Sequence, residues 1–290
     1  MDVYFDIFSG ISGNMVLGAL IDLGLNWEEL NAELDKLGLS DEYELRVKEI
    51  DKKGITATYV DVKLKGGHHS HHVHENNNCN NKSTNEAHKE NNEHNQQNDN
   101  STQHNNDHTN SRKLSDIERL INKSDLSSNI KQKSKQIFLN LAEAEAKIHN
   151  KKTEEIHFHE VGAVDAIVDI VGSVIGLDLL GIEKIYASRV NTGTGFVECD
   201  HGKLPVPAPA TMELLQEVPL YSTGINKELV TPTGAAIITT LADGYGFRPE
   251  MKIEKTGYGA GSYNLEIPNL LRINMGEIIS QKKKKRTLSC

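Results

Sequence analysis

The chain has 290 residues, a formal net charge of -9 and 37% hydrophobic residues, which is low for a globular protein. The length suits one large domain or two modest ones, and the negative charge, with no basic stripe before the last ten residues, argues against a nucleic-acid partner. The most apolar window, residues 163–182, carries three aspartates, which argues against a membrane span, and no signal peptide opens the chain, so we expect a cytoplasmic protein.

The first 65 residues are predicted to form strands and helices of one domain. Their apolar periodicity predicts, in chain order, a strand over 3–8, helices over 14–23 and 27–37, and strands over 43–50 and 55–64. Asn26 is the expected cap of the second helix, and residues 51–54 are expected to join the last two strands as a hairpin.

Residues 66–112 form a low-complexity segment that holds 14 Asn and 9 of the chain's 13 His. With almost no aliphatic residues it cannot offset the conformational entropy of folding, so we expect a disordered loop. Five of its histidines fall within seven residues, namely His68, His69, His71, His72 and His74. Such a run is suited to capture nickel, zinc or copper with little geometric selectivity, whereas the Asn-rich remainder is typical of a polar spacer.

Residues 113–276 are predicted to complete the same domain. Periodicity predicts helices near 115–122, 129–149, 163–180 and 234–243, short strands and turns rich in Gly and Pro between the last two helices, and final strands around 253 and 271. Strands and helices mix without regular alternation. We therefore expect an α+β fold, in which helices accompany a mixed α/β sheet and the histidine-rich loop is inserted.

One short segment of this second part combines imidazole and carboxylate side chains. Its candidate metal ligands and catalytic groups are His157, His159, Glu160, Asp165 and Asp169. The two histidines alternate, so an extended backbone directs both to one side, and the two aspartates lie four apart on one face of a helix. This mixture suits a borderline divalent metal such as nickel, zinc or manganese. The same face continues through the small residues Gly172, Ser173 and Gly176, which would let a ligand or a second backbone come close. The alternative is a buried helix with a polar first turn.

Two glycine-containing turns lead into predicted helices and offer backbone N–H groups to an anion. The first follows the first strand, with Asp6 at the carboxyl end of that strand and Ser12 and Gly13 at the start of the helix. The second contains Thr231, Thr233 and Gly234. Each turn suits phosphate, and each is also compatible with ordinary helix capping. His201, which lies in a turn, is a further candidate metal ligand.

Four blocks of sequence resemble the LarC family, the nickel insertion proteins of nickel-pincer cofactor synthesis. They are residues 5–15 (FDIFSGISGNM), 157–172 (HFHEVGAVDAIVDIVG), 201–211 (HGKLPVPAPAT) and 228–236 (ELVTPTGAA). A histidine-rich insertion of variable length at this place is also typical of the family. One position departs from the pattern, because Asn14 stands where Asp is expected.

The resemblance implies a reaction. Members of the family insert Ni(II) into pyridinium-3,5-bisthiocarboxylic acid mononucleotide, forming nickel–sulfur bonds and a nickel–carbon bond, with CTP as cosubstrate and Mg(II) or Mn(II). The product is the cofactor of lactate racemase, which with the other cofactor-synthesis proteins is the expected partner; a homo-oligomer is compatible with the sequence. In this frame Asp6, Glu160, Asp165 and Asp169 are candidates for catalysis, the two glycine-containing turns for phosphate, and His157, His159 and His201 for metal.

Two other functions fit the residues. The chain alone could store or deliver nickel through His68–His74 without catalysis, or it could be a metal-dependent phosphatase or nucleotidyl enzyme that uses Asp6, Asp165 and Asp169.

The resemblance also bears on the last residues. Family members of full length continue into a second domain that binds CTP, whereas residues 277–290 form a basic tail with four consecutive lysines. Such a run implies an adenine-rich message on which a ribosome can slip. We expect the chain to be the N-terminal part of a frame-split gene, inactive or incomplete without the CTP-binding part; a basic terminus of a complete protein is the alternative.

Overall fold

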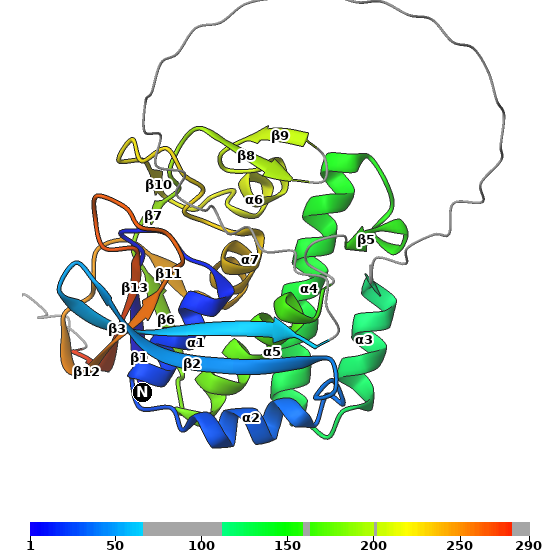
Figure 1. The fold of residues 1–290 in the computed structure, drawn as a ribbon, viewed down its shortest axis with the longest axis horizontal. Helices are drawn as coiled ribbons and strands as arrows, with labels where there is room; N and C mark the ends of the chain where they lie inside the picture. The colour runs from blue at the N-terminus through cyan, green and yellow to red at the C-terminus, as the bar shows by residue number, and fades with distance from the viewer. Residues whose placement is uncertain (66–111, 159–162, 200–201, 280–290) are drawn as a thin grey trace, which may run out of the picture.

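The computed structural model of the chain describes residues 1–65, 112–158, 163–199 and 202–279. It confirms the predicted α+β class, since helices pack against a mixed sheet (Figure 1). Among the described residues, the helices are α1 (Gly13–Asp22), α2 (Trp27–Asp35), α3 (Leu114–Lys123), α4 (Ser128–His149), α5 (Val164–Leu179), α6 (Pro209–Leu214) and α7 (Pro232–Leu241), with a 3-10 turn, η1 (Thr153–Glu155). None of these helices has the length and apolar character needed to cross a membrane.

The strands of the main sheet come from both ends of the chain. They are β1 (Asp2–Asp6), β2 (Tyr43–Lys52), β3 (Ile55–Leu64), β6 (Lys184–Ala187), β11 (Gly244–Tyr245), β12 (Met251–Ala260) and β13 (Leu270–Ile278). Their order is β11-β6-β1-β13-β12-β3-β2. The strand β1 is parallel to β6 and antiparallel to β13, so the first strand of the chain lies in the middle of the sheet.

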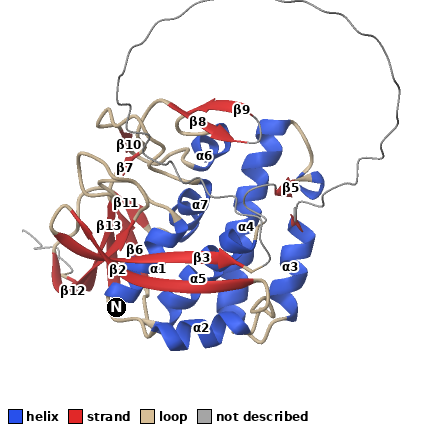
Figure 2. Cartoon of the chain, in the orientation of Figure 1, coloured by secondary structure: helices blue, strands red, loops and turns tan. Residues whose placement is uncertain are grey.

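Short strands form three further pairs outside the main sheet. They are β4 (Arg112–Lys113) with β5 (His157–Phe158), β7 (Val190–Asn191) with β10 (Leu220–Tyr221), and β8 (Phe196–Cys199) with β9 (Gly202–Pro205). In the view of Figure 2, most helices lie to one side of the main sheet, and the pairs β7–β10 and β8–β9 lie above it.

The core lies between the sheet and the helix α1. Val3 and Phe5 of β1 are completely or almost completely buried, as is nearly all of α1, which has apolar residues all round. This helix packs on β12 and β3 with one side and on α5 with another. Burial on two sides explains why its sequence shows little amphipathic contrast.

The structure confirms two predictions made from short stretches of sequence, the cap of α2 and the turn between β2 and β3. Asn26 caps α2, because its side chain accepts hydrogen bonds from the backbone N–H groups of Glu28 and Glu29. The hairpin between β2 and β3 turns at Lys53 and Gly54, which have φ of 60° and 82°. Two successive positive φ values are those of a turn that matches the twist of the strands.

Candidate functional site

The two glycine-containing turns, far apart in sequence, are joined by hydrogen bonds. Ile11 N–H donates to Leu229 O at 2.9 Å, and Thr231 N–H donates to Ile11 O at 3.1 Å. The approach depends on glycine, since a Cβ at Gly10 would lie 1.8 Å from Leu229 O and one at Gly234 would lie 2.3 Å from Ile11 O. The starts of α1 and α7 therefore face one place in the molecule.

A third segment, around β7, closes the same junction. The backbone N–H of Asn191 donates to Ile7 O at 3.3 Å, and its side-chain amide donates to Phe8 O at 2.7 Å. Leu229 N–H donates to Thr192 O at 3.3 Å. The two predicted turns and the segment around β7 thus meet just beyond the carboxyl end of β1, a position at which α/β sheets commonly bind ligands.

The start of α7 carries two hydroxyl groups at its open backbone N–H groups. The side chain of Thr231 caps the helix by accepting a hydrogen bond from Gly234 N–H at 3.2 Å, and its hydroxyl lies 2.9 Å from that of Thr233. Hydroxyl groups and the positive end of a helix dipole together suit a phosphate group.

The two aspartates of α5 differ in their surroundings. Asp169 has a buried Oδ1 without a hydrogen-bond partner among the described residues, while Asp165 remains exposed. Burial raises the pKa of Asp169 well above its ordinary value, the charges of Asp165 and Asp61 raise it further, and a hydrogen bond from Asn14 N–H partly opposes them. Desolvation also raises the pKa of Asp165, against hydrogen bonds from the N–H groups of Ala166 and of Asp165 itself. A carboxylate with a raised pKa is a better proton acceptor than an ordinary one.

The carboxylate of Asp169 also accepts a hydrogen bond from the first turn of α1. Ser12 precedes this helix but its side chain does not cap it; its hydroxyl donates instead to Asn14 Oδ1 at 2.6 Å. The other end of the Asn14 amide donates to Val60 O at 3.4 Å. An aspartate at position 14, as the family pattern has it, could not donate to that carbonyl, and it would add a negative charge beside Asp169.

The small residues of α5 serve helix packing. A Cβ at Gly172 would lie 3.1 Å from Leu17 of α1, and one at Gly176 would lie 2.9 Å from Leu25 and 3.0 Å from Leu20. A second element therefore fills the space beside these glycines. Of the two interpretations of this face, close approach of another segment is the one that the structure bears out.

Asp6 is paired with an arginine that the sequence analysis did not single out. The guanidinium group of Arg272, at the opposite position of β13, donates to Asp6 Oδ2 through Nε at 3.0 Å and also through Nη2. A signal was present, because Arg272 is the only basic residue of its strand and stands between Leu271 and Ile273. Its partner could not be named without the strand order.

The predicted histidine ligands are only partly described. His157 is exposed and pairs with Lys113 between β5 and β4, whereas His159, Glu160 and His201 lie outside the described residues, as do the histidines at 68–74. Within the described ranges, no three His, Cys, Asp or Glu side chains are arranged to hold a metal ion. The structure thus brings Asp165 and Asp169 together without joining His157 to them.

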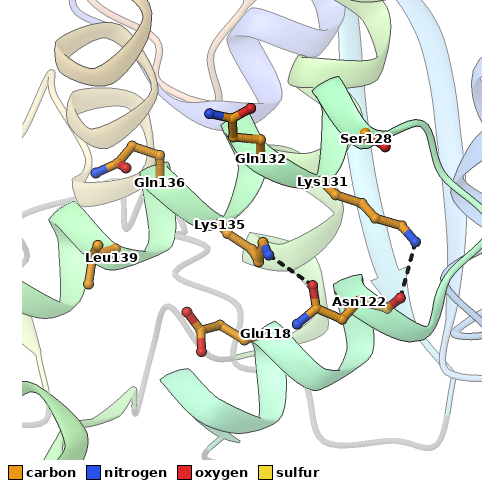
Figure 3. Close-up of a pocket in the computed structure, with 8 residues that line it drawn as sticks. All are labelled: Glu118, Asn122, Ser128, Lys131, Gln132, Lys135, Gln136 and Leu139. Carbon is orange, nitrogen blue, oxygen red and sulfur yellow. Dashed lines mark hydrogen bonds between the residues drawn. The ribbon is translucent and has the colours of Figure 1, made fainter.

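A cavity of about 360 Å³ lies elsewhere, between α3 and α4 (Figure 3). Its polar groups bind one another: Lys131 Nζ donates to Asn122 O at 3.1 Å, and Lys135 Nζ donates to Asn122 Oδ1 at 2.9 Å. None of the predicted site residues lines it. This groove is therefore separate from the junction at the end of β1.

Comparison with known proteins identifies relatives over nearly the whole chain. Residues 3–289 match the family model described as nickel insertion protein. A protein of Desulfitobacterium hafniense named pyridinium-3,5-bisthiocarboxylic acid mononucleotide nickel insertion protein is 46% identical over 97% of this chain and 59% of its own length. A Clostridium acetobutylicum protein of the same name is 49% identical, over 95% of this chain and 64% of its own length.

The chain thus spans less than two thirds of the length of these curated relatives. No solved structure matches it.

Proposed function

Because the chain belongs to the nickel insertion protein family, we propose that it inserts nickel into pyridinium-3,5-bisthiocarboxylic acid mononucleotide, a step in the synthesis of a nickel-pincer cofactor. The observation that carries the proposal is the 46% identity, over 97% of this chain, to a protein named for that step. The meeting of three motif segments beyond β1 supports it, because a mononucleotide needs a phosphate site beside the groups that act on its ring.

For the phosphate we propose the start of α7, where Thr231, Thr233 and Gly234 offer hydroxyl and N–H donors. Ser12 and Gly13 border the same ligand in this proposal, since a Cβ at Gly234 would lie 2.8 Å from the Ser12 Cα. Asp169 already accepts a hydrogen bond from the first turn of α1. The start of α7 is therefore the better anion site of the two.

For the chemical step we propose proton transfer to the carboxylates of α5. A nickel–carbon bond forms at a ring carbon as its C–H bond breaks, so the proton must pass to a base while nickel stays divalent. Asp165 is exposed, has a raised pKa and can accept this proton, with Asp169 one helical turn behind it. His157, His159 and His201 are proposed to hold the incoming nickel ion, and Glu160 is proposed as a further catalytic group.

Whole-protein properties are part of the same proposal. We propose that the reaction is of the lyase class, uses CTP with Mg(II) or Mn(II), and supplies lactate racemase with its cofactor, as the family resemblance implies. We also propose that CTP use needs the part of the relatives' length that this chain does not span, which is 41% of the Desulfitobacterium protein (100% minus the 59% that is covered).

The test is nickel insertion in vitro, measured by mass spectrometry of the nucleotide product. The chain is assayed alone and fused to the remaining part of the Desulfitobacterium relative, with nickel, CTP, Mg(II) or Mn(II) and the thiolated mononucleotide. We expect nickelated product from the fusion, and a loss of about 100-fold or more in rate for Asp165→Asn. Asp178→Asn is the matched control, because Asp178 lies on the same helix and binds Asn129 at 2.7 Å. Absence of nickelated product from both proteins would reject the proposal.

Nickel storage through the histidine-rich run is the second candidate, and one contact allows it to be tested cleanly. Lys65 N–H donates to Glu42 O at 2.8 Å, and Arg112 Nη2 donates to Glu42 Oε2 at 2.7 Å. The residues on either side of 66–111 therefore meet at Glu42, so a short Gly-Ser linker can replace that segment. A store would then lose most of its nickel capacity, whereas an inserting enzyme would keep its turnover when nickel is plentiful.

A further inference from the structure

One face of the main sheet packs on α1, and the opposite face carries the charged pair Asp6 and Arg272. Gly259 of β12 lies against α1, since a Cβ there would be 1.8 Å from Met15 O, and its partner in β13 is Leu271. Alternation along β13 therefore directs Arg272 to the opposite face, where Asp6 is its partner in β1. That face carries charge at the carboxyl end of β1.

Arg272 is held in place from two sides. Besides its hydrogen bonds to Asp6, its guanidinium carbon lies 5.8 Å from the centre of the Phe8 ring. The side chain of Arg272 is 37% exposed, and that of Asp6 is 19% exposed. The pair is thus fixed but remains open to a ligand, and a fixed guanidinium group binds planar oxyanions well.

A second arginine lies at the carboxyl end of β1, on the side of β6. Ser188 N–H donates to Phe5 O at 2.8 Å and Ile7 N–H donates to the Ser188 hydroxyl at 2.9 Å, so the chain at 188–189 runs alongside the end of β1. Arg189 is exposed, and its guanidinium carbon lies 4.6 Å from the centre of the Tyr221 ring. No carboxylate of the described residues pairs with it.

A third arginine lies beside the same strand. Arg248 is close enough to Tyr4 for its charge to act on the phenol, together with those of Asp6 and Arg272. Tyr4 in turn donates to Gly246 O at 3.0 Å, which anchors the loop that carries Arg248. Three arginines thus lie near the carboxyl end of β1, where Asp6 pairs with one of them, in a chain whose formal net charge is -9. Such a local excess of positive charge attracts anions that the rest of the protein repels.

We propose that Arg189, Arg248 and Arg272, at the carboxyl end of β1, form an oxyanion-binding site for the mononucleotide substrate. The proposal rests on the proposed function, since it names the part of the substrate-binding site that recognises negative charge. With the phosphate assigned to the start of α7, the ring carboxylate or thiocarboxylate is the group proposed for this site; phosphate shares the same oxyanion chemistry, and the titration test distinguishes the two. Asp6 is then a positioning residue that orients Arg272.

The test is calorimetric titration of the full chain with pyridinium nucleotides that are commercially accessible. Nicotinic acid mononucleotide carries phosphate and carboxylate, nicotinamide mononucleotide lacks the carboxylate, and nicotinic acid riboside lacks the phosphate. Arg189→Gln and Arg248→Gln are the variants, since both residues are exposed and neither makes an ion pair within the described chain. Arg119→Gln, which removes an exposed arginine from α3, is the matched control.

We expect Arg189→Gln to weaken binding of nicotinic acid mononucleotide at least about tenfold, with no change for Arg119→Gln. If the loss appears only with ligands that carry a carboxylate, the site holds the ring carboxylate or thiocarboxylate. If it appears only with ligands that carry phosphate, the site holds phosphate. Equal affinity of wild type and both variants for every probe, or no binding by the wild-type chain, would overturn the proposal.

These titrations need neither nickel nor CTP, so their outcome is independent of the nickel insertion assay. Arginine-dependent binding without insertion activity would keep the anion site and reject the proposed function. Insertion activity that is unchanged in Arg189→Gln and Arg248→Gln would reject the site and keep the function.

Discussion

Gly13, the first residue of α1, lies directly against the side chain of Asp169 on α5. A Cβ at Gly13 would be 2.6 Å from the Asp169 Cβ and 2.7 Å from Oδ2. This closeness lets Asn14 N–H donate to the carboxylate, which replaces the cap that Ser12 does not provide. Packing of the two helices and placement of the candidate base therefore depend on the same contact.

Substitution of Gly13 by alanine is predicted to destabilise the protein by about 1–3 kcal/mol, because the new methyl group overlaps an atom fixed to the α5 backbone. Denaturant unfolding of the two proteins measures the difference. Gly244→Ala is the control, because a Cβ at Gly244 would meet the Tyr186 ring at an ordinary 3.7 Å. Equal stability of Gly13→Ala and the wild type would show that α1 and α5 can move apart freely.

The raised pKa of Asp169 predicts a definite pH dependence. Above its ordinary value of 3.8 the unfolded chain loses this proton while the folded protein keeps it, so the contribution of Asp169 to stability falls as pH rises toward the folded pKa. Asp169→Asn removes that cost. We expect this variant to be more stable than the wild type at pH 7, with the difference shrinking as pH falls to about 4.

The measurement is the free energy of unfolding of wild type and Asp169→Asn between pH 4 and pH 7. Asp178→Asn, on the same helix, is the control. The nearby charges of Asp165 and Asp61 act in the same direction as burial, so they reinforce the effect. A less stable Asp169→Asn at pH 7 would mean that the hydrogen bond to the start of α1 outweighs the cost of burial.

The sequence predicted features whose causes lie within a few residues. The cap at Asn26, the turn at Lys53 and Gly54, and the position of Asp165 and Asp169 on one helix face all follow from local spacing. Each depends on backbone geometry over four or five residues, and this is why local pattern was enough.

Contacts set by strand order could not be predicted. Asp6 and Arg272 are 266 positions apart, and they meet only because β13 lies next to β1. Likewise, the local pattern around Gly10 and Gly234 does not show that each glycine leaves room for the backbone of the other segment. The two turns were predicted to offer backbone N–H groups to a phosphate, and in the structure Gly10 and Gly234 each lie against the backbone of the other segment.

The hydroxyl of Thr231 caps α7, so its removal has a predictable cost. Thr231→Val keeps the side-chain shape but leaves Gly234 N–H without its acceptor, and we expect a loss of about 1 kcal/mol in unfolding free energy. Thr231→Ser retains the acceptor and is expected to remain close to the wild type. If Val and Ser variants unfold at the same denaturant concentration, the hydrogen bond seen here does not contribute to stability.

Substitution of Asp6 tests whether this residue positions Arg272 or acts on the substrate itself. In Asp6→Asn the negative charge beside Arg272 is removed while the shape is kept, so an anionic ligand no longer competes with a carboxylate. We expect nicotinic acid mononucleotide to bind about threefold more tightly, since one unit charge at short range in water-exposed surroundings is worth about that much. The lost ion pair, which is partly exposed, should cost about 1 kcal/mol or less in stability. Asp116→Asn, which breaks the exposed pair with Arg119, is the matched control. Weaker ligand binding by Asp6→Asn would show that the orientation of Arg272 by Asp6 matters more for the ligand than the negative charge of Asp6.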